Sequence, residues 1–298
     1  MFQAIFHTKN GLNYVELSSS KGDSLARICL EEGGRLDVLT LNNMYLITDN
    51  KSFKYKDSFA SAILFPFANR VNNGKYAFEG KLYSLDCNEV DNNNALHGLV
   101  YNKTFEVIKK QITSDFALIE LQYKAVDISA GFPFKYNISI TYKLSHKGLN
   151  LKLKVKNTDK KSFPFTLGWH PYFLSADLYN SSINFESKTE VESDSKMITK
   201  GTKLFKTPMP FQIKNSKLDN AYVLENNKLL FITPNYKMCI TSSAKENYLQ
   251  LYTPNISNLI AIEPTTGVSD SLNNKMGLQT LESGTSYTVE YLLNLENV

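Results

Sequence analysis

The main pattern in the chain is an alternation of apolar and polar residues, which predicts β-strands. In residues 149–156, leucine or valine stands at every odd position, and asparagine or lysine stands at every even one. Residues 136–144 show the same period of two, and His146-Lys147-Gly148 between the stretches predicts a turn that exposes His146. Each strand is expected to bury one face and expose the other to solvent, as in an antiparallel sheet. We interpret the lysines on the wet face first as a solvated surface and only second as an anion site.

Shorter apolar runs bounded by turn residues extend this pattern toward both ends of the chain. They occupy residues 14–30, 36–41, 63–71, 118–123, 229–232, 238–241, 249–253, 259–263 and 287–295. We find no convincing amphipathic helix longer than about three turns, no exact repeat and no clear linker. The sequence therefore predicts an all-β fold, a large sandwich forming a single domain over residues 1–298.

One turn is signalled by sequence alone. Asn73-Gly74 follows the apolar residues 63–71 and precedes residues 75–83, and an Asn-Gly pair favours a tight hairpin. We therefore expect residues 75–83 to return as one strand alongside residues 63–71. Arg70 would end the first strand, either as a surface arginine that caps the hairpin or as a forked donor for hydroxyls or an anionic group.

Composition and charge exclude several classes of protein. The 298 residues are 42% hydrophobic and carry a net charge of only +4 without a dense basic block, so nucleic acid is not an expected partner. Cys29, Cys87 and Cys239 are widely spaced, with no CxxC or Cys/His cluster, which predicts free thiols rather than a disulfide framework or a metal site. The N-terminal residues lack a long apolar run behind basic residues, so we expect no secretory signal, and no apolar run is long enough to predict a membrane span. We expect a soluble cytoplasmic protein.

Four residues stand out chemically before any comparison. His170 lies in the run Gly168-Trp169-His170-Pro171-Tyr172-Phe173, where the proline favours an extended backbone and flat rings surround the histidine. It fits the floor of a sugar-sized pocket, or else a buried histidine bonded to a carbonyl. Glu263 ends the apolar run 259–262, and burying a carboxylate is costly unless it is paired or used. A catalytic role and a structural ion pair both remain open for it. His97, beside Gly98, and Asp219, at the start of an apolar run, are weaker signals that structural roles also explain.

Taken together, five motifs resemble those of the aldose 1-epimerase (galactose mutarotase) family, in the same order and from about residue 63 to the C-terminus. The motifs are Pro66-Phe67-Ala68-Asn69-Arg70-Val71-Asn72-Asn73-Gly74, Leu96-His97-Gly98, His170-Pro171-Tyr172-Phe173, Asp219-Asn220-Ala221-Tyr222 and Ile262-Glu263-Pro264. The resemblance implies a single galactose mutarotase-like β-supersandwich with an open sugar-binding cleft. It also implies that His170 is the general acid and Glu263 the general base. Arg70, His97 and Asp219 match the positions that hold the sugar hydroxyls.

Three departures from the family pattern bear on the sugar rather than on the reaction. His97 is followed by Gly-Leu where many members have a second glycine, and His170 follows Gly-Trp. Glu263 is followed by Pro-Thr-Thr in place of the commoner continuation. Trp169 is the residue that we expect to stack on the sugar's C–H face.

The activity that the resemblance implies is the interconversion of the α and β anomers of a free hexose, such as glucose or galactose. Ring opening needs a proton taken from the C1 hydroxyl and a proton given to the ring oxygen. Glutamate and histidine, with ordinary pKa values of about 4.3 and 6.5, suit these transfers near neutral pH. No metal, nucleotide or redox cofactor is required.

Three alternatives remain. One is a mutarotase for a phosphorylated hexose, which would need a cationic cluster beside Arg70. The second is a non-catalytic sugar-binding domain, and the third is a structural β-domain that buries these residues in ion pairs. The expected partner is a small-molecule aldose, the expected assembly is a monomer or homodimer, and neither nucleic acid nor membrane is expected to bind.

Overall fold

Nearly all regular structure in the chain is β, as predicted. The computed structural model describes residues 1–49, 54–126 and 128–296. Helical structure in these residues is limited to short turns: α1 (Tyr55–Ser58), η1 (Asn72–Gly74) and α2 (Ser271–Asn274). No helix within the described ranges is long and apolar enough to cross a membrane.

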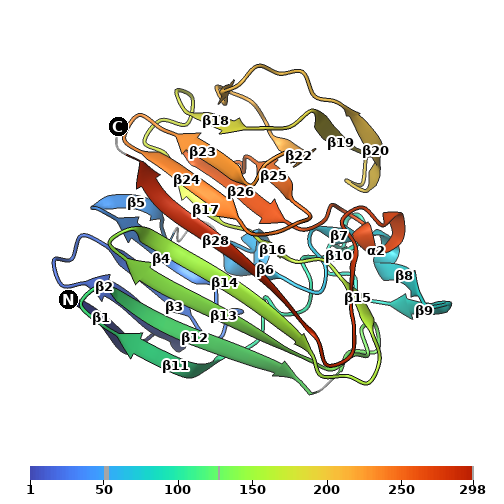
Figure 1. Cartoon of the computed structure of the whole chain (residues 1–298). Helices are drawn as coiled ribbons and strands as arrows, with labels where there is room; N and C mark the ends of the chain where they lie inside the picture. Colours follow the sequence, from blue (N-terminus) through green and yellow to red (C-terminus); the bar gives the residue numbers. More distant parts are fainter. Residues whose placement is uncertain (50–53, 127, 297–298) are drawn as a thin grey trace.

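The largest sheet has nine strands and runs diagonally across the front of the molecule (Figure 1). In spatial order its strands are β11 (Glu106–Ile112), β12 (Phe116–Ala125), β13 (Tyr136–Ser145), β14 (Gly148–Asn157), β28 (Ser286–Glu296), β24 (Lys237–Ser242), β23 (Lys228–Ile232), β18 (Ser182–Phe185) and β21 (Phe211–Gln212). The C-terminal strand β28 pairs with both β14 and β24, so it joins the two halves of the sheet.

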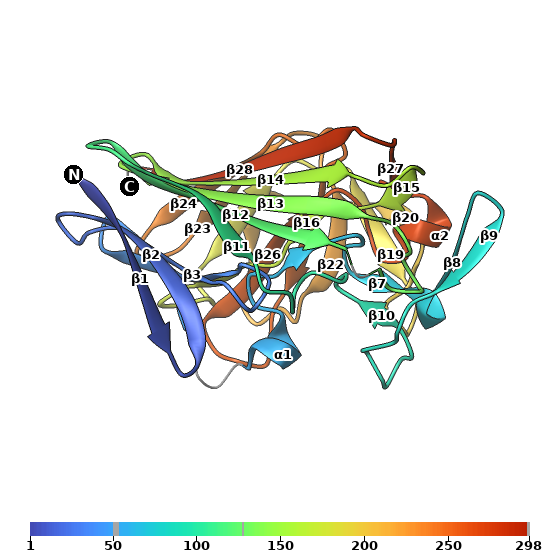
Figure 2. The same ribbon diagram turned by 90° about the horizontal axis from the view of Figure 1, so that it is seen from below.

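A second sheet of eight strands lies behind the first. Its order is β20 (Thr199–Leu204), β19 (Thr189–Ser193), β22 (Asp219–Val223), β25 (Tyr248–Tyr252), β26 (Leu259–Thr265), β16 (Gly168–Trp169) and β6 (Ile63–Leu64), with β17 (Tyr172–Leu174) also paired to β26. Seen from below, β28, β14, β13 and β12 form the upper layer, and β26, β16 and β22 lie beneath them (Figure 2).

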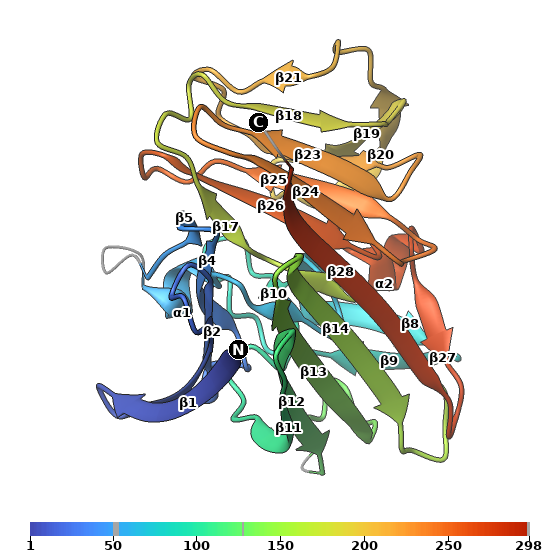
Figure 3. The ribbon, with the colours of Figure 1, turned by 60° about the vertical axis from the view of Figure 1, so that its left-hand side comes forward.

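The remaining strands form smaller sheets. Five N-terminal strands pair in sequence order: β1 (Phe2–Lys9), β2 (Leu12–Ser19), β3 (Leu25–Cys29), β4 (Leu36–Leu41) and β5 (Met44–Ile47). Three two-stranded sheets pair β7 (Arg70–Val71) with β10 (Ala95–Leu96), β8 (Lys75–Phe78) with β9 (Lys81–Ser84), and β15 (Phe163–Phe165) with β27 (Gln279–Leu281). Strands β1 and β2 lie at one end of the molecule, and β18 and β21 lie at the other (Figure 3).

The core forms between the two large sheets, where apolar side chains of both meet. The indole of Trp169 on β16 stacks on the ring of Tyr291 on β28, with 6.2 Å between ring centroids. The Tyr291 hydroxyl also donates to the carbonyl of Pro264 on β26. The predicted alternation in residues 149–156 is confirmed, since the leucines and valine are buried while Lys154 and Lys156 are exposed. His146 is exposed in its turn, also as predicted.

The hairpin predicted at Asn73-Gly74 is wrong. Asn73 and Gly74 do adopt left-handed backbone angles, with φ of 51° and 64°, but the turn leads out of the short strand β7. Strand β7 pairs with β10 instead, and residues 75–83 form a hairpin of their own that turns at Glu79-Gly80. Local turn chemistry was thus identified correctly, whereas the pairing partner was decided by contacts distant in sequence.

Candidate active site

The centre of the candidate site is a contact between His170 and Glu263. The Nε2 atom of His170 lies 3.4 Å from Oε1 of Glu263, and both side chains are about 5% exposed (6% and 4%). Strand alternation places them: Trp169 faces the core between the sheets, so His170, the next residue, faces the opposite side. Backbone hydrogen bonds with Ala62 and Ser61 then fix the His170 peptide. The structure therefore brings together two residues that lie far apart in sequence.

Burial governs the protonation of this pair. It lowers the pKa of His170 to about 4, with the Arg70 charge adding to the effect. It raises the pKa of Glu263 well above its usual value, an effect that the nearby Asp219 strengthens and Arg70 opposes. Burial thus favours the uncharged form of each group, a neutral imidazole beside a protonated carboxyl. The pair thus combines a proton donor with a proton acceptor.

His97 forms one wall beside the pair. Its ring meets the His170 ring edge-on, with centroids 4.8 Å apart, and its other side touches Phe59 at 4.9 Å. The His97 backbone has a φ of 62°, a strained angle for a residue with a Cβ, and such strain is concentrated at functional sites. Burial lowers the His97 pKa well below its usual value, so the imidazole is neutral. Its Nδ1, like that of His170, has no hydrogen-bond partner within the described part of the chain.

Gly98 explains how His97 is held there. The Phe65 backbone packs directly against it: a Cβ on Gly98 would lie 2.3 Å from the Phe65 carbonyl oxygen. Gly98 also has a φ of 80°, which glycine adopts without strain. The main chain beside His97 is thereby locked against the strand that precedes Arg70.

Arg70 reaches the same region from β7, whose backbone pairs with Leu96. Its guanidinium is bound by Glu89: Nε donates to both carboxylate oxygens at 3.0 and 3.1 Å, and Nη2 lies 2.9 Å from Oε1. Nη1 donates to the side-chain oxygen of Asn69 at 3.0 Å. Arg70 is therefore a fixed cation rather than a flexible surface cap.

Asp219 approaches from the other side, at the start of β22. Its Oδ1 accepts a 2.7 Å hydrogen bond from Nε2 of Gln250, and Gln250 is the cross-strand neighbour of Glu263. Burial raises the pKa of Asp219, against the effect of Arg70. Asp219 and Arg70 are only partly buried, whereas His97, His170 and Glu263 are buried, so the acid and base groups lie deepest.

The structure thus gathers all the residues predicted from the motifs and adds two that the motifs did not indicate. Glu89 holds Arg70, and Gln250 holds Asp219; neither lies in a recognisable motif. The expectation that Trp169 stacks on a sugar is wrong, because Trp169 is 0% exposed and packs between the sheets. Of the aromatic residues near it in sequence, Tyr172 is the one that stacks on His170, with 5.0 Å between centroids.

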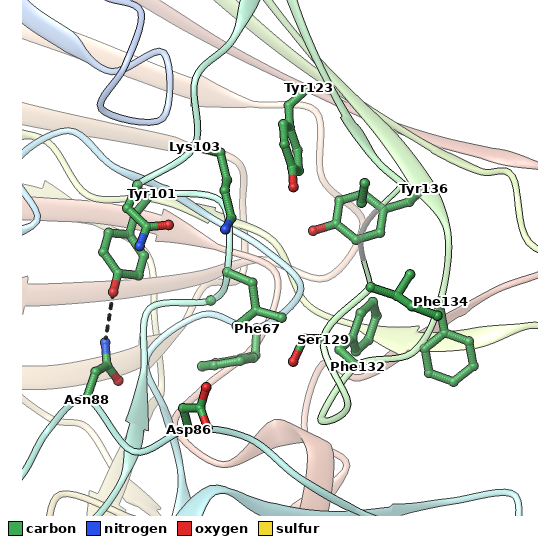
Figure 4. Close-up of a pocket in the computed structure, with 15 residues that line it drawn as sticks. Phe67, Asp86, Asn88, Tyr101, Lys103, Tyr123, Ser129, Phe132, Phe134 and Tyr136 are labelled. Carbon is green, nitrogen blue, oxygen red and sulfur yellow. Dashed lines mark hydrogen bonds between the residues drawn. The ribbon is translucent and has the colours of Figure 1, made fainter.

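A cavity of about 230 Å³ lies beside the site but is separate from it. Gly98 and Leu99 line it, together with rings and polar tips from Phe67, Lys103 and Tyr136 (Figure 4). Arg70, His97, His170, Asp219 and Glu263 are not among its lining residues. Among the described residues, no group of three or more histidine, cysteine or acidic side chains could hold a metal ion.

Comparison with known proteins identifies the family to which this all-β sandwich belongs. The model of the aldose 1-epimerase family matches residues 17–294, and the chain belongs to that family.

Individual relatives are distant in sequence. Uncharacterized protein YihR of Escherichia coli K12 is 24% identical over 281 residues, spanning 90% of this chain and 89% of its own. A galactose mutarotase-like protein from Clostridium acetobutylicum superposes with a TM-score of 0.89 at 20% identity, over 100% of this chain and 99% of that one. Galactose 1-epimerase from Lactobacillus acidophilus superposes with a TM-score of 0.79 at 16% identity, over 100% of this chain and 99% of that one. At these identities, the structural likeness establishes the fold.

Proposed function

We propose that this chain is an aldose 1-epimerase that interconverts the α and β anomers of a free hexose such as glucose or galactose. The observation that carries the proposal is the buried His170–Glu263 contact, because it sets an imidazole beside a carboxyl group, two side chains that can give and take a proton. Family membership supports the reaction class.

The reaction follows from the chemistry of the pair. Transfer of the shared proton from Glu263 to His170 gives a carboxylate and an imidazolium without exchange with solvent. The carboxylate of Glu263 then takes the proton of the C1 hydroxyl, while His170 gives its proton to the ring oxygen, and the ring opens. After rotation about the C1–C2 bond, the same two groups act in reverse and close the ring on the other face. The pair ends with the one proton that it began with.

Arg70, His97 and Asp219 are proposed to bind the sugar hydroxyls. The guanidinium of Arg70 donates, the carboxylate of Asp219 accepts, and the neutral imidazole of His97 can do either. Because their partners Glu89 and Gln250 fix two of these side chains, little orientation would have to be gained on binding.

The experiment is to follow the approach to anomeric equilibrium of freshly dissolved α-glucose and α-galactose by polarimetry, with and without protein. Wild type should accelerate it. Glu263→Gln and His170→Asn should each lower kcat by about 10²- to 10⁴-fold, the usual contribution of a general acid or base. His146→Asn is the matched control, because His146 is exposed in a turn, and it should match wild type. If wild type binds a hexose but accelerates no aldose, including hexose 6-phosphates, the chain is a binding domain and the proposal fails.

A further inference from the structure

The carboxylate of Glu89 occupies one whole edge of the Arg70 guanidinium. It accepts from Nε through both oxygens and lies 2.9 Å from Nη2, while Asn69 takes one hydrogen of Nη1. An arginine side chain carries five N–H donors. One hydrogen on each terminal nitrogen therefore remains for a ligand, whereas the positive charge already has a partner.

Glu89 is itself held in place and ionised. The side-chain amide of Asn94, which is 0% exposed, donates to Oε2 of Glu89 at 2.8 Å. Asn94 in turn accepts from the backbone N–H of Asn73, just after β7, so the contact ties the loop around Glu89 to the Arg70 strand. Burial would raise the pKa of Glu89, but the hydrogen bonds from Arg70 and Asn94 outweigh it and hold that pKa below its usual value.

The other charges of the site are acidic or neutral. Arg70 is the cation whose charge acts on His97, His170, Asp219 and Glu263 alike. Glu89 pairs with that positive charge at close range, and Asp219 adds a further acidic group to the site. A phosphate, sulfate or carboxylate entering this site would therefore lose its water shell without meeting an unpaired cation, which is unfavourable.

We propose that Glu89 is a specificity-determining residue that restricts the site to uncharged aldoses. It acts by positioning Arg70 and pairing with its charge, so that the guanidinium binds hydroxyl groups rather than anions. This inference rests on the proposed function, since it names the substrate class of the same site.

The test compares glucose with glucose 6-phosphate in wild type and Glu89→Gln, which keeps the shape of the side chain and removes its charge. We measure kcat/KM by NMR exchange and Kd by calorimetry, at low salt and in 0.5 M sodium chloride. Wild type should prefer glucose. Glu89→Gln should raise kcat/KM for glucose 6-phosphate relative to glucose at least tenfold, mainly through KM. The gain should shrink in high salt, because the interaction is electrostatic.

Matched variants separate selectivity from folding. Glu32→Gln removes one of the two carboxylates that pair with Arg35, the other being Asp37, in an ion-pair cluster away from the site, and it should leave the preference unchanged. Glu89→Asp keeps the charge and should retain the exclusion of the phosphate. Should Glu89→Gln fail to fold, Glu89→Ala removes the same charge without presenting an amide to Asn94.

The inference is overturned if wild type accepts glucose 6-phosphate as well as glucose. It is equally overturned if removing the charge changes both sugars by the same factor. Binding measurements distinguish a failure of this inference from a failure of the proposed function. If the protein binds glucose, rejects glucose 6-phosphate and accelerates anomer exchange of neither sugar, the epimerase activity is refuted, while the selectivity role of Glu89 stands.

Discussion

The protonation of the His170–Glu263 pair makes a definite prediction about the pH dependence of activity. Burial lowers the pKa of His170 to about 4 and raises that of Glu263 well above its usual value. As pH falls through about 4, the pair takes up a second proton and loses its base. As pH rises, the pair keeps its proton until the raised pKa of Glu263 is reached. We therefore expect kcat/KM to rise above about pH 4 to a plateau that lasts until the raised pKa of Glu263 is reached.

The size of the effect follows from these values. At pH 5, one unit above the His170 pKa, about a tenth of the molecules carry the second proton, so activity should be about nine-tenths of its plateau. If the two groups had their ordinary pKa values of about 4.3 and 6.5, the form with one proton would predominate only between these two pH values. At pH 7, about a quarter of the molecules would still be in that form. The two cases differ most clearly at pH 7 and above.

The assay is the enzyme-dependent rate of anomer exchange from pH 4.5 to 9, with the spontaneous rate subtracted at each pH because anomers also interconvert in buffer. Measurements at a sugar concentration well below KM report kcat/KM and thus the pKa values of the free protein. A narrow bell centred near pH 5.5, with most activity gone by pH 7.5, would refute the argument that burial controls the pair. His146→Asn should reproduce the wild-type profile.

Further predictions concern residues around the pair. Glu263→Gln should raise Tm by at least about 2 °C at pH 8 but not near pH 4. The reason is that the raised pKa of Glu263 costs the wild type stability as the pH rises. A Tm equal to or below that of the wild type at pH 8 contradicts this. Trp169→Phe should lower the free energy of unfolding in urea by about 1–3 kcal/mol with KM unchanged, whereas a higher KM would favour sugar stacking. Gly98→Ala should lower Tm and kcat/KM together, because its Cβ would meet the Phe65 carbonyl at 2.3 Å. Gln250→Leu removes the donor to Asp219 and should raise KM severalfold with little change in kcat.

Strand periodicity was readable from sequence where a strand has one wet face. Residues 149–156 were predicted correctly because their alternation reflects burial on one side only. The hairpin at Asn73-Gly74 failed because a left-handed turn does not specify which strands it joins. Strand β7 is only two residues long, and it pairs with β10 through a contact that no local pattern encodes.

The site divides in a similar way. His170, Glu263, Arg70, His97 and Asp219 were found through motifs, and the structure brings them together. Their partners were missed, because Glu89 and Gln250 are ordinary residues whose importance arises only from the folded contacts. Gln250 carries one weak signal, a polar residue within the apolar run 249–253. Glu89 carries none beyond its place before a polar loop.

The same burial accounts for both the reactivity proposed for the site and its cost to the fold. Removing a carboxyl and an imidazole from water favours their uncharged forms. At neutral pH the carboxyl, whose pKa is raised, works against stability, whereas the imidazole, whose pKa is lowered to about 4, does so only below its ordinary pKa of about 6.5. In the proposed mechanism, this same uncharged state supplies the proton that ring opening needs, because the carboxyl and the imidazole are in contact. A site exposed to water would restore the ordinary pKa values and hold this proton only in a narrow acidic range. We therefore expect variants that let water reach Glu263 to gain stability and lose activity at neutral pH. In such variants Tm should rise while kcat/KM falls, so measuring both quantities on the same variant tests the argument.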